Sequence, residues 1–395
     1  MKKWTAVLLC LCLLLSVRFS CRAETAEPGP GVDAPSALLM TLSGQALWEK
    51  DAHAPREPAS VTKVMTLLLV CEAIDGGSLS LEDTVTASAY AASMGGSQIW
   101  LKEGETFTVE EMLKCVVIAS ANDCAVALGE HLAGSEESFV QRMNARAEEL
   151  GMADTHFVNC CGLTAPGHVT SAYDIGLMSA CLLREHPWIS DYATTWQDTV
   201  RDGAFGLDNT NKLLKHYPGM TGLKTGYTSS AGYCISASAQ REELHLIAVV
   251  LGSARKEDRS RDVCTKDRFA TASTLLDWGF ANYAAVRFTP DQPLMPIPVS
   301  LGTREQADCV LAEAQPQVLP RSWLGELTKE VQLEERLQAP VAKGQQVGWL
   351  VVRREGTEVC RIPVNAAEEI PRLTLLQIFR RLFFCAAGKK FMGNS

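Results

Sequence analysis

The stretch that decides the fold is "PASVTKVMTLLLV", residues 58–70, in which a serine and a lysine stand among apolar side chains. Pro58 ends the preceding loop and is a favourable residue at the start of a helix. The apolar residues that follow lie nearly all around the helix axis, which is typical of a helix buried on most sides. Ser60 and Lys63 share one face of this helix, because residues at i and i+3 are neighbours on a helix surface.

The pairing of Ser60 with Lys63 has two interpretations. A hydroxyl at a helix N-terminus lies near backbone N–H groups that stabilise negative charge. A lysine buried in hydrocarbon has a lowered pKa, so its neutral amine is available as a base, and the pair then forms an activated nucleophile. Alternatively, Ser60 caps the helix and the stem of Lys63 lies on the surface. Spacing alone does not decide, since a second S-x-x-K runs from Ser253 to Lys256 in a polar stretch.

The composition describes an exported globular protein. The chain has 395 residues, 47% of them hydrophobic, which is enough for two domains with a core each. Lys2 and Lys3 precede an apolar run, and small residues end it at Ala23, so residues 1–23 are predicted to be a secretory signal peptide. Its removal takes away four basic side chains and changes the formal charge from −9 to −13. We expect no nucleic-acid partner for so acidic a chain.

Cysteines and histidines give no sign of a metal site. Eleven of the fourteen cysteines follow the signal peptide, none with the C-x-x-C spacing of a zinc site, and most lie in apolar contexts. We interpret them mainly as packing residues, with a disulfide framework as the alternative. The seven histidines are scattered without paired ligand spacing. No metal and no cofactor is therefore expected.

The order of predicted elements indicates an α+β catalytic domain. Residues 24–34 are acidic and rich in Pro and Gly, which predicts a flexible leader. Residues 36–50 and 233–252 each predict a β-hairpin, and helical signals dominate the chain from Pro58 to Arg184. A final helix is expected over residues 271–283. This order predicts helices packed around one mainly antiparallel sheet.

The C-terminal part differs in composition. Residues 286–368 contain short strand signals divided by Pro and Gly, which predicts a separate small all-β domain. Residues 370–395 follow, with no apolar span of 20 residues and with basic side chains between apolar ones. They predict an amphipathic helix that anchors the protein to an anionic membrane surface. The alternative is a helix docked on the β domain. The basic residues that stand between the apolar ones are Arg380, Arg381, Lys389 and Lys390.

Two further short motifs follow the S-x-x-K motif in the chain. Ser120 and Asn122 lie in "ASANDCA", after an apolar helical stretch. Lys224, Thr225 and Gly226 form a K-T-G that leads directly into a strand. Each motif alone is a weak signal, but all three in this order and in fitting contexts form a strong one.

These three motifs resemble those of the penicillin-recognising serine enzymes. Within them, residues 35–390 resemble the low-molecular-weight penicillin-binding proteins that are D-alanyl-D-alanine carboxypeptidases. The resemblance implies a β-lactamase/transpeptidase-like sandwich over residues 35–285, with a five-stranded antiparallel sheet between helical layers. It also implies peptidoglycan stem peptides ending in D-Ala-D-Ala as substrates and β-lactams as covalent inhibitors.

The resemblance and the chemistry together assign roles to the motif residues. Ser60 is expected to attack the substrate carbonyl and form an acyl-enzyme, and Lys63 is expected to act as its base. The positive charge of Lys224 is expected to help keep Lys63 neutral. Ser120 is expected to relay a proton to the leaving amine, and Asn122 to hold Lys63 and the substrate amide. The backbone N–H groups of Ser60 and Tyr227 are expected to form the oxyanion hole, and Gly226 to let the peptide approach the strand.

The free carboxylate of the substrate needs cationic and hydroxyl partners. Lys224 and Thr225 supply some of them. By count along the aligned hairpin, the family's carboxylate-binding arginine falls on Arg259, with Arg255 and Arg261 as neighbouring candidates.

Three other functions share parts of this pattern. A class A β-lactamase has S-D-N where this chain has Ser120-Ala121-Asn122, and no E-x-x-L-N stretch is found here. A non-catalytic scaffold that only recognises peptidoglycan fits poorly with intact motifs. A D,D-endopeptidase uses the same catalytic set and stays open. For all of them the expected location is outside the cell, and for the carboxypeptidase it is the outer face of the bacterial cytoplasmic membrane.

Overall fold

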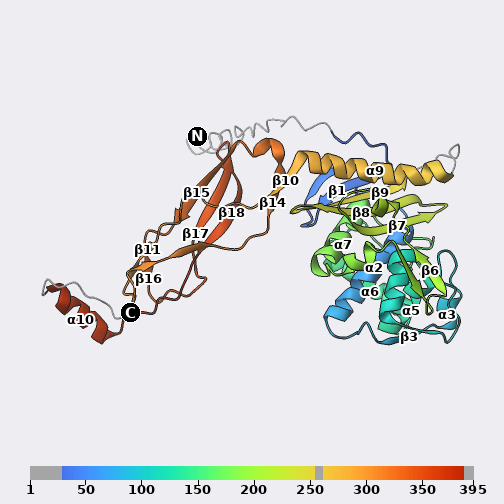
Figure 1. Cartoon of the computed structure of the whole chain (residues 1–395), viewed down its shortest axis with the longest axis horizontal. Helices are drawn as coiled ribbons and strands as arrows, with labels where there is room; N and C mark the ends of the chain where they lie inside the picture. The colour runs from blue at the N-terminus through green and yellow to red at the C-terminus, as the bar shows by residue number, and fades with distance from the viewer. Residues whose placement is uncertain (1–28, 254–260, 387–395) are drawn as a thin grey trace, which may run out of the picture.

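The computed structural model describes residues 29–253 and 261–386 (Figure 1). The predicted signal peptide, residues 1–23, and the first part of the predicted leader lie outside the described residues.

A five-stranded antiparallel sheet forms the centre of the N-terminal part of the protein. Both predicted hairpins are present in it, as β1–β2 and as β8–β9. K-T-G lies on β7, which is an edge strand, so one side of this motif is not covered by another strand. In spatial order the strands are β2 (Ala46–Lys50), β1 (Ser36–Thr41), β9 (Leu244–Ser253), β8 (Gly232–Arg241) and β7 (Met220–Thr228).

Successive residues of the central strands face two different hydrophobic cores. Ile247 and Val249 of β9 belong to the core that contains helices α2, α5 and α7. Leu246 and Ala248 belong to the core on the other face, which contains α9. Side chains alternate along a strand, so one apolar strand contributes to both cores. The result is the predicted antiparallel sheet between helical layers, and Figure 1 shows α9 on one face of the sheet and the other helices on the opposite face.

The helical elements have the following bounds. They are η1 (Ala59–Thr62, a 3₁₀ turn), α2 (Lys63–Asp75), α3 (Ala89–Ala92), α4 (Val109–Lys114), η2 (Cys115–Ala119, a π-turn), α5 (Asn122–Ala133), α6 (Glu136–Glu149), α7 (Ala172–Glu185), α8 (Ile189–Ala193), η3 (Lys212–Lys215) and α9 (Arg261–Asn282). Short hairpins connect some of them, formed by β3 (Thr84–Thr86), β4 (Thr106–Thr108), β5 (Gln197–Val200) and β6 (Phe205–Asp208).

A β-rich part follows α9. Figure 1 shows it beside the helical part, connected through β10 and β14. It has two small cores of its own, one around Val347 and Val364 and the other around Leu350 and Val352. Its elements are β10 (Tyr283–Val286), β11 (Ile297–Ser300), β12 (Gln306–Ala307), β13 (Cys309–Leu311), β14 (Gln317–Pro320), η4 (Arg321–Trp323), β15 (Leu327–Leu333), β16 (Leu337–Gln338), β17 (Gln346–Arg354) and β18 (Thr357–Ala366).

The last described helix, α10 (Leu375–Ala386), begins later than the sequence predicts. Ile370 is buried and pairs with Val341 of the β-rich part, so the chain is still extended there and turns helical only once it has left this contact. Lys389 and Lys390, which the sequence analysis assigns to the helix, lie outside the described residues.

Cysteine side chains contribute mainly to packing. Nine of them are described, all as free thiols, and seven are buried. Those seven belong to the core between α2, α5, α7 and the sheet, where cysteine behaves as a small hydrophobic residue.

Candidate active site

Ser60 lies in a tight turn immediately before helix α2. The turn is the 3₁₀ segment η1, and the regular helix begins only at Lys63. Ala59, directly before Ser60, has a φ of 48°, in the left-handed region that is strained for a residue with a Cβ. The Thr62 hydroxyl donates to the Ala59 carbonyl over 2.9 Å and closes this turn. The sequence therefore predicts the helix correctly but not the strained turn at its start.

The Lys63 side chain brings two of the three motifs together. Its Nζ donates to Ser60 Oγ over 3.1 Å and to Asn122 Oδ1 over 2.5 Å. A third bond, over 2.7 Å, goes to the backbone carbonyl of Cys161, which sequence reasoning missed. The side chain is fully buried, so the alternative of a surface lysine beside a helix cap is wrong.

Burial lowers the pKa of Lys63 from its ordinary value. Desolvation of the ammonium is the largest cause, and the nearby Asp123 carboxylate acts in the opposite direction. Lys224 also has a pKa well below its ordinary value, first because it is buried and then because Lys63 and Arg268 carry like charge. The lowered pKa of Lys63 is therefore due mainly to burial.

The second motif lies where a π-turn changes into helix α5. Ser120 ends the turn η2 with a φ of 64°, and its buried Oγ has no hydrogen-bond partner among the described residues. Asn122 begins α5, where its N–H donates to the Ser97 carbonyl and its Nδ2 to the Gly95 carbonyl, each over 2.7 Å. These bonds fix the amide so that its Oδ1 points at Lys63.

The third motif lies on edge strand β7, next to the Ser60 turn. A Cβ on Gly226 would lie 2.9 Å from both the Pro58 carbonyl oxygen and the Ser60 nitrogen, so only glycine allows the strand to come this close. The predicted oxyanion groups, the N–H of Ser60 and of Tyr227, thus come from neighbouring segments. Lys224 is buried, and Thr225 Oγ1 donates to Thr210 Oγ1 over 2.7 Å.

The predicted carboxylate-binding residue, Arg259, lies outside the described residues, and so does the candidate Arg255. The third candidate, Arg261, begins helix α9, but only its backbone is described. The structure instead points to Arg268, which sequence reasoning missed. Arg268 is buried, donates from Nη1 to the Gly226 carbonyl over 3.0 Å, and has no carboxylate partner among the described residues.

Burial lowers the pKa of the Arg268 guanidinium to about 10, and its Nε is buried without a partner in the described part of the chain. A signal for this residue exists in the sequence. Among the α9 side chains that the structure describes, Arg268 is the one charged residue in the buried stripe, together with Phe269, Ala272, Leu275 and Leu276.

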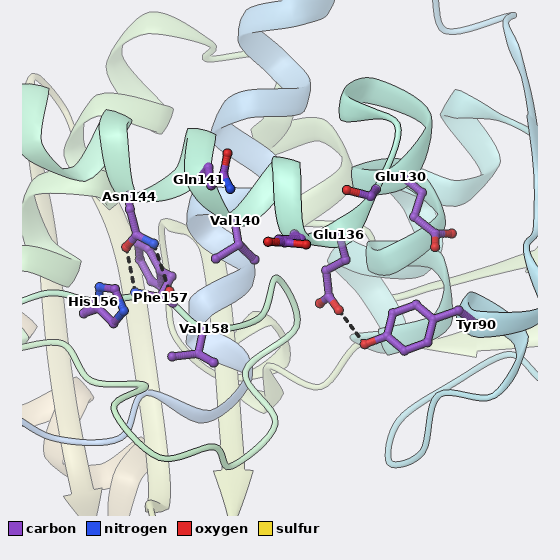
Figure 2. A pocket seen from close by; sticks show the side chains of 11 residues that line it. Tyr90, Glu130, Glu136, Val140, Gln141, Asn144, His156, Phe157 and Val158 are labelled. Atoms are coloured by element: carbon purple, nitrogen blue, oxygen red, sulfur yellow. Dashed lines mark hydrogen bonds between the residues drawn. The ribbon is translucent and has the colours of Figure 1, made fainter.

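A pocket of about 550 Å³ lies on the other side of the segment that carries the Cys161 carbonyl. Figure 2 shows Tyr90 pointing at Glu136, and Asn144 bonded to the Phe157 backbone. Glu136 also accepts from the Cys160 N–H over 3.0 Å. The pocket is lined by none of the three motifs, so its side chains support the segment behind the site and do not form the cleft in front of Ser60.

Within the described residues no group of three or more His, Cys, Asp or Glu side chains could hold a metal ion.

Comparison with known proteins identifies the family. The model of the D-alanyl-D-alanine carboxypeptidase family matches residues 22–255, and that of the C-terminal domain of penicillin-binding protein 5 matches residues 288–372. The first match covers more than half of the chain, so the chain belongs to the D-alanyl-D-alanine carboxypeptidase family.

Individual relatives agree with this assignment. The chain is 38% identical over 355 residues to the D-alanyl-D-alanine carboxypeptidase DacF of Bacillus subtilis, covering 88% of this chain and 89% of the relative. Penicillin-binding protein 5 of Haemophilus influenzae is similar with a TM-score of 0.73 and 27% identity, over 88% of this chain and 100% of that one.

Penicillin-binding protein D2 of Listeria monocytogenes, in its ampicillin-bound form, is similar with a TM-score of 0.56 and 31% identity, over 64% of this chain and 100% of that one. The protein is thus a serine-type D-alanyl-D-alanine carboxypeptidase, as predicted, and not a class A β-lactamase.

Proposed function

We propose that Ser60 is the nucleophile that removes the terminal D-alanine from peptidoglycan stem peptides, with Lys63 as its base. The observation that carries the proposal is the buried Lys63 amine, which bonds both Ser60 Oγ and Asn122 Oδ1. A neutral amine at this position takes the Ser60 proton as Oγ attacks the carbonyl of the penultimate D-alanine. The developing oxyanion lies between the N–H groups of Ser60 and Tyr227.

The acyl-enzyme forms when the C–N bond breaks and D-alanine leaves. Its amine needs a proton, and Ser120 passes it on from the Lys63 ammonium. The buried Ser120 Oγ, with no partner among the described residues, is oriented by substrate instead of by the protein. Water then attacks the ester carbonyl with Lys63 again as the base, which releases the shortened peptide and restores Ser60. β-Lactams acylate the same hydroxyl.

The carboxylate of the terminal D-alanine binds at the K-T-G strand. Thr225 and Lys224 provide a hydroxyl and a cation there. We assign the arginine of this subsite to Arg268, because a buried guanidinium without a carboxylate partner among the described residues calls for an anion. Arg259 is the alternative that the sequence predicts.

Replacement of Ser60 by alanine tests the nucleophile. Ser60→Ala is expected to lose labelling by a fluorescent penicillin and at least about three orders of magnitude in turnover of a D-Ala-D-Ala pentapeptide. The labelled peptide of the unchanged enzyme, mapped by mass spectrometry, should contain Ser60; a label on Ser120 contradicts the mechanism. The same instrument separates the two peptidase activities, since a carboxypeptidase shortens the pentapeptide by one residue and leaves a crosslinked dimer intact.

The pH dependence of acylation tests Lys63. Because the pKa of Lys63 in the folded protein is below its ordinary 10.5, the neutral amine accumulates as pH rises through that lowered value. The rate of acylation by penicillin should therefore rise with pH and level off below pH 10.5. Lys63→Arg should be nearly as inactive as Lys63→Ala, because a guanidinium stays protonated. An arginine variant that acylates at the normal rate contradicts this role.

Two arginine variants distinguish the candidates for the carboxylate subsite. Arg268→Gln is expected to lower kcat/KM about 10- to 150-fold for a peptide with a free C-terminal carboxylate, the effect of one charge-assisted bond of about 1.5–3 kcal/mol. A substrate with an esterified C-terminus should lose much less. Arg259→Gln is the matched control and should lose little on either. If Arg259→Gln instead loses kcat/KM on the free carboxylate substrate and Arg268→Gln does not, the subsite belongs to Arg259. If Arg268→Gln loses kcat/KM equally on both substrates, Arg268 only supports strand β7.

We further propose that helix α10 holds the enzyme on the outer face of the cytoplasmic membrane. Phe379 and Phe383, 69% and 74% exposed, lie one turn apart, as they must to enter a bilayer together. Arg380 is exposed and Arg381 bonds to Glu305, so one of these two cations is already occupied by the protein. In the part of the chain that the structure describes, no helix is long and apolar enough to cross a membrane.

A chain that ends at Thr374 tests the anchor and keeps Ile370 in its buried place. It should turn over small peptides at the normal rate but no longer co-sediment with vesicles that contain phosphatidylglycerol. Binding of the full mature chain should weaken only in part in high salt, because apolar burial is not screened. If the shortened chain binds vesicles equally well, the anchor lies elsewhere; if it aggregates, the helix belongs to the β-rich part.

A further inference from the structure

We propose that His168 is a positioning residue of the nucleophile, which holds the strained turn before Ser60 in place through Thr62. The inference rests on the proposed role of Ser60. His168 does not touch Ser60 itself. It belongs to the loop between the Cys161 carbonyl and helix α7, and it contacts Thr62 of the Ser60 turn.

The direction of each hydrogen bond in this contact is fixed by chemistry. The Val158 N–H can only donate, so Nδ1 of His168 accepts it, over 3.0 Å. The imidazole is then neutral with its proton on Nε2, which donates to Thr62 Oγ1 over 2.8 Å. Thr62 Oγ1 in turn donates to the Ala59 carbonyl over 2.9 Å. The chain of donors runs one way, from Val158 through His168 and Thr62 to Ala59.

The turn that receives this chain of bonds needs support. Ala59 adopts a left-handed φ of 48°, which costs a residue with a Cβ about 1–2 kcal/mol. The same loop contacts the Ala59 carbonyl a second time through Gly162, where a Cβ would lie only 1.9 Å from the carbonyl oxygen. The Ala59 carbonyl is thus held by the hydrogen bond from Thr62 and by close packing against Gly162.

Burial makes the contact rigid and keeps the imidazole neutral. His168 is 2% exposed and Thr62 is fully buried, so water does not compete for these bonds. Burial also lowers the pKa of His168 to about 4, helped by His156 and opposed by the carboxylates of Glu57 and Glu136. Nδ1 therefore stays an acceptor at pH values above about 4.

The same imidazole relates the nucleophile to its base. The loop that His168 fixes at Val158 carries the Cys161 carbonyl, which bonds Lys63 Nζ over 2.7 Å. His168 therefore sets the Ser60 turn through Thr62 and one acceptor of Lys63 through Val158. A small shift in the distance between nucleophile and base is enough to lower the rate of acylation strongly, because misplacement by about 1 Å costs up to about 100-fold.

Two pairs of variants separate positioning from general stability. His168→Gln places an amide nitrogen where Nε2 was and keeps the bond to Thr62, whereas His168→Asn keeps an acceptor for Val158 but does not reach Thr62. Thr62→Ser keeps the hydroxyl and Thr62→Val removes it without changing the shape. We expect acylation by penicillin to fall about 10- to 100-fold in His168→Asn and Thr62→Val and less than about threefold in His168→Gln and Thr62→Ser. The loss should appear in kcat, with KM for a pentapeptide nearly unchanged.

The outcomes distinguish this inference from the proposed function. If His168→Asn and Thr62→Val melt at a lower temperature yet acylate at the normal rate, His168 only stabilises the fold and the inference is wrong. It is also wrong if the glutamine and serine variants lose as much rate as their partners. If His168→Asn does not fold, the Thr62 pair decides alone. Penicillin labelling of the unchanged enzyme tests the proposed function separately from these four variants. If the label lies on a residue other than Ser60, the proposed function is wrong, whatever the variants show.

Discussion

The burial of the Lys63 amine is the constraint on which the site depends. A protonated lysine without water needs acceptors for its three hydrogens, and the fold supplies three from separate segments: Ser60 Oγ, Asn122 Oδ1 and the Cys161 carbonyl. In the neutral amine two hydrogens remain for Asn122 and Cys161, and the lone pair faces Ser60 Oγ, whose proton it accepts. Removing the amine from water lowers its pKa, so the interaction that demands this arrangement also produces the base. Structure and reactivity have the same physical origin here.

The central sheet makes that arrangement possible. Its two faces are covered by helices, so α2 is buried on nearly all sides, and its edge strand β7 stays open beside the Ser60 turn. Two of the residues with a left-handed backbone conformation, Ala59 and Ser120, lie at the same place. Such conformations persist only where surrounding contacts determine them, and both residues are buried between packed elements.

The β-rich part and helix α10 relate to the site only indirectly. Two small cores hold the β-rich part together independently of the catalytic core, and the exposed apolar residues of α10 lie at the far end of it (Figure 1). The proposed membrane contact through α10 would place the enzyme near its substrate and leave the chemistry around Lys63 unchanged. The extended segment around Ile370 pairs with Val341 of the β-rich part, which is why the helix starts later than its apolar pattern indicates.

The sequence by itself determined the three motifs, their order and the alternation that places β-strands between helical layers, because these are local patterns with a fixed period. The apolar residues around Lys63 indicated a buried helix, but the spacing of Ser60 and Lys63 alone left a surface lysine open. Only the tertiary structure decided which backbone carbonyl meets Lys63, that Ala59 is strained, and that Arg268 and His168 reach the site from distant segments. Backbone carbonyls carry no sequence signal, and a single arginine or histidine in an apolar stretch acquires a partner only when remote segments pack against each other.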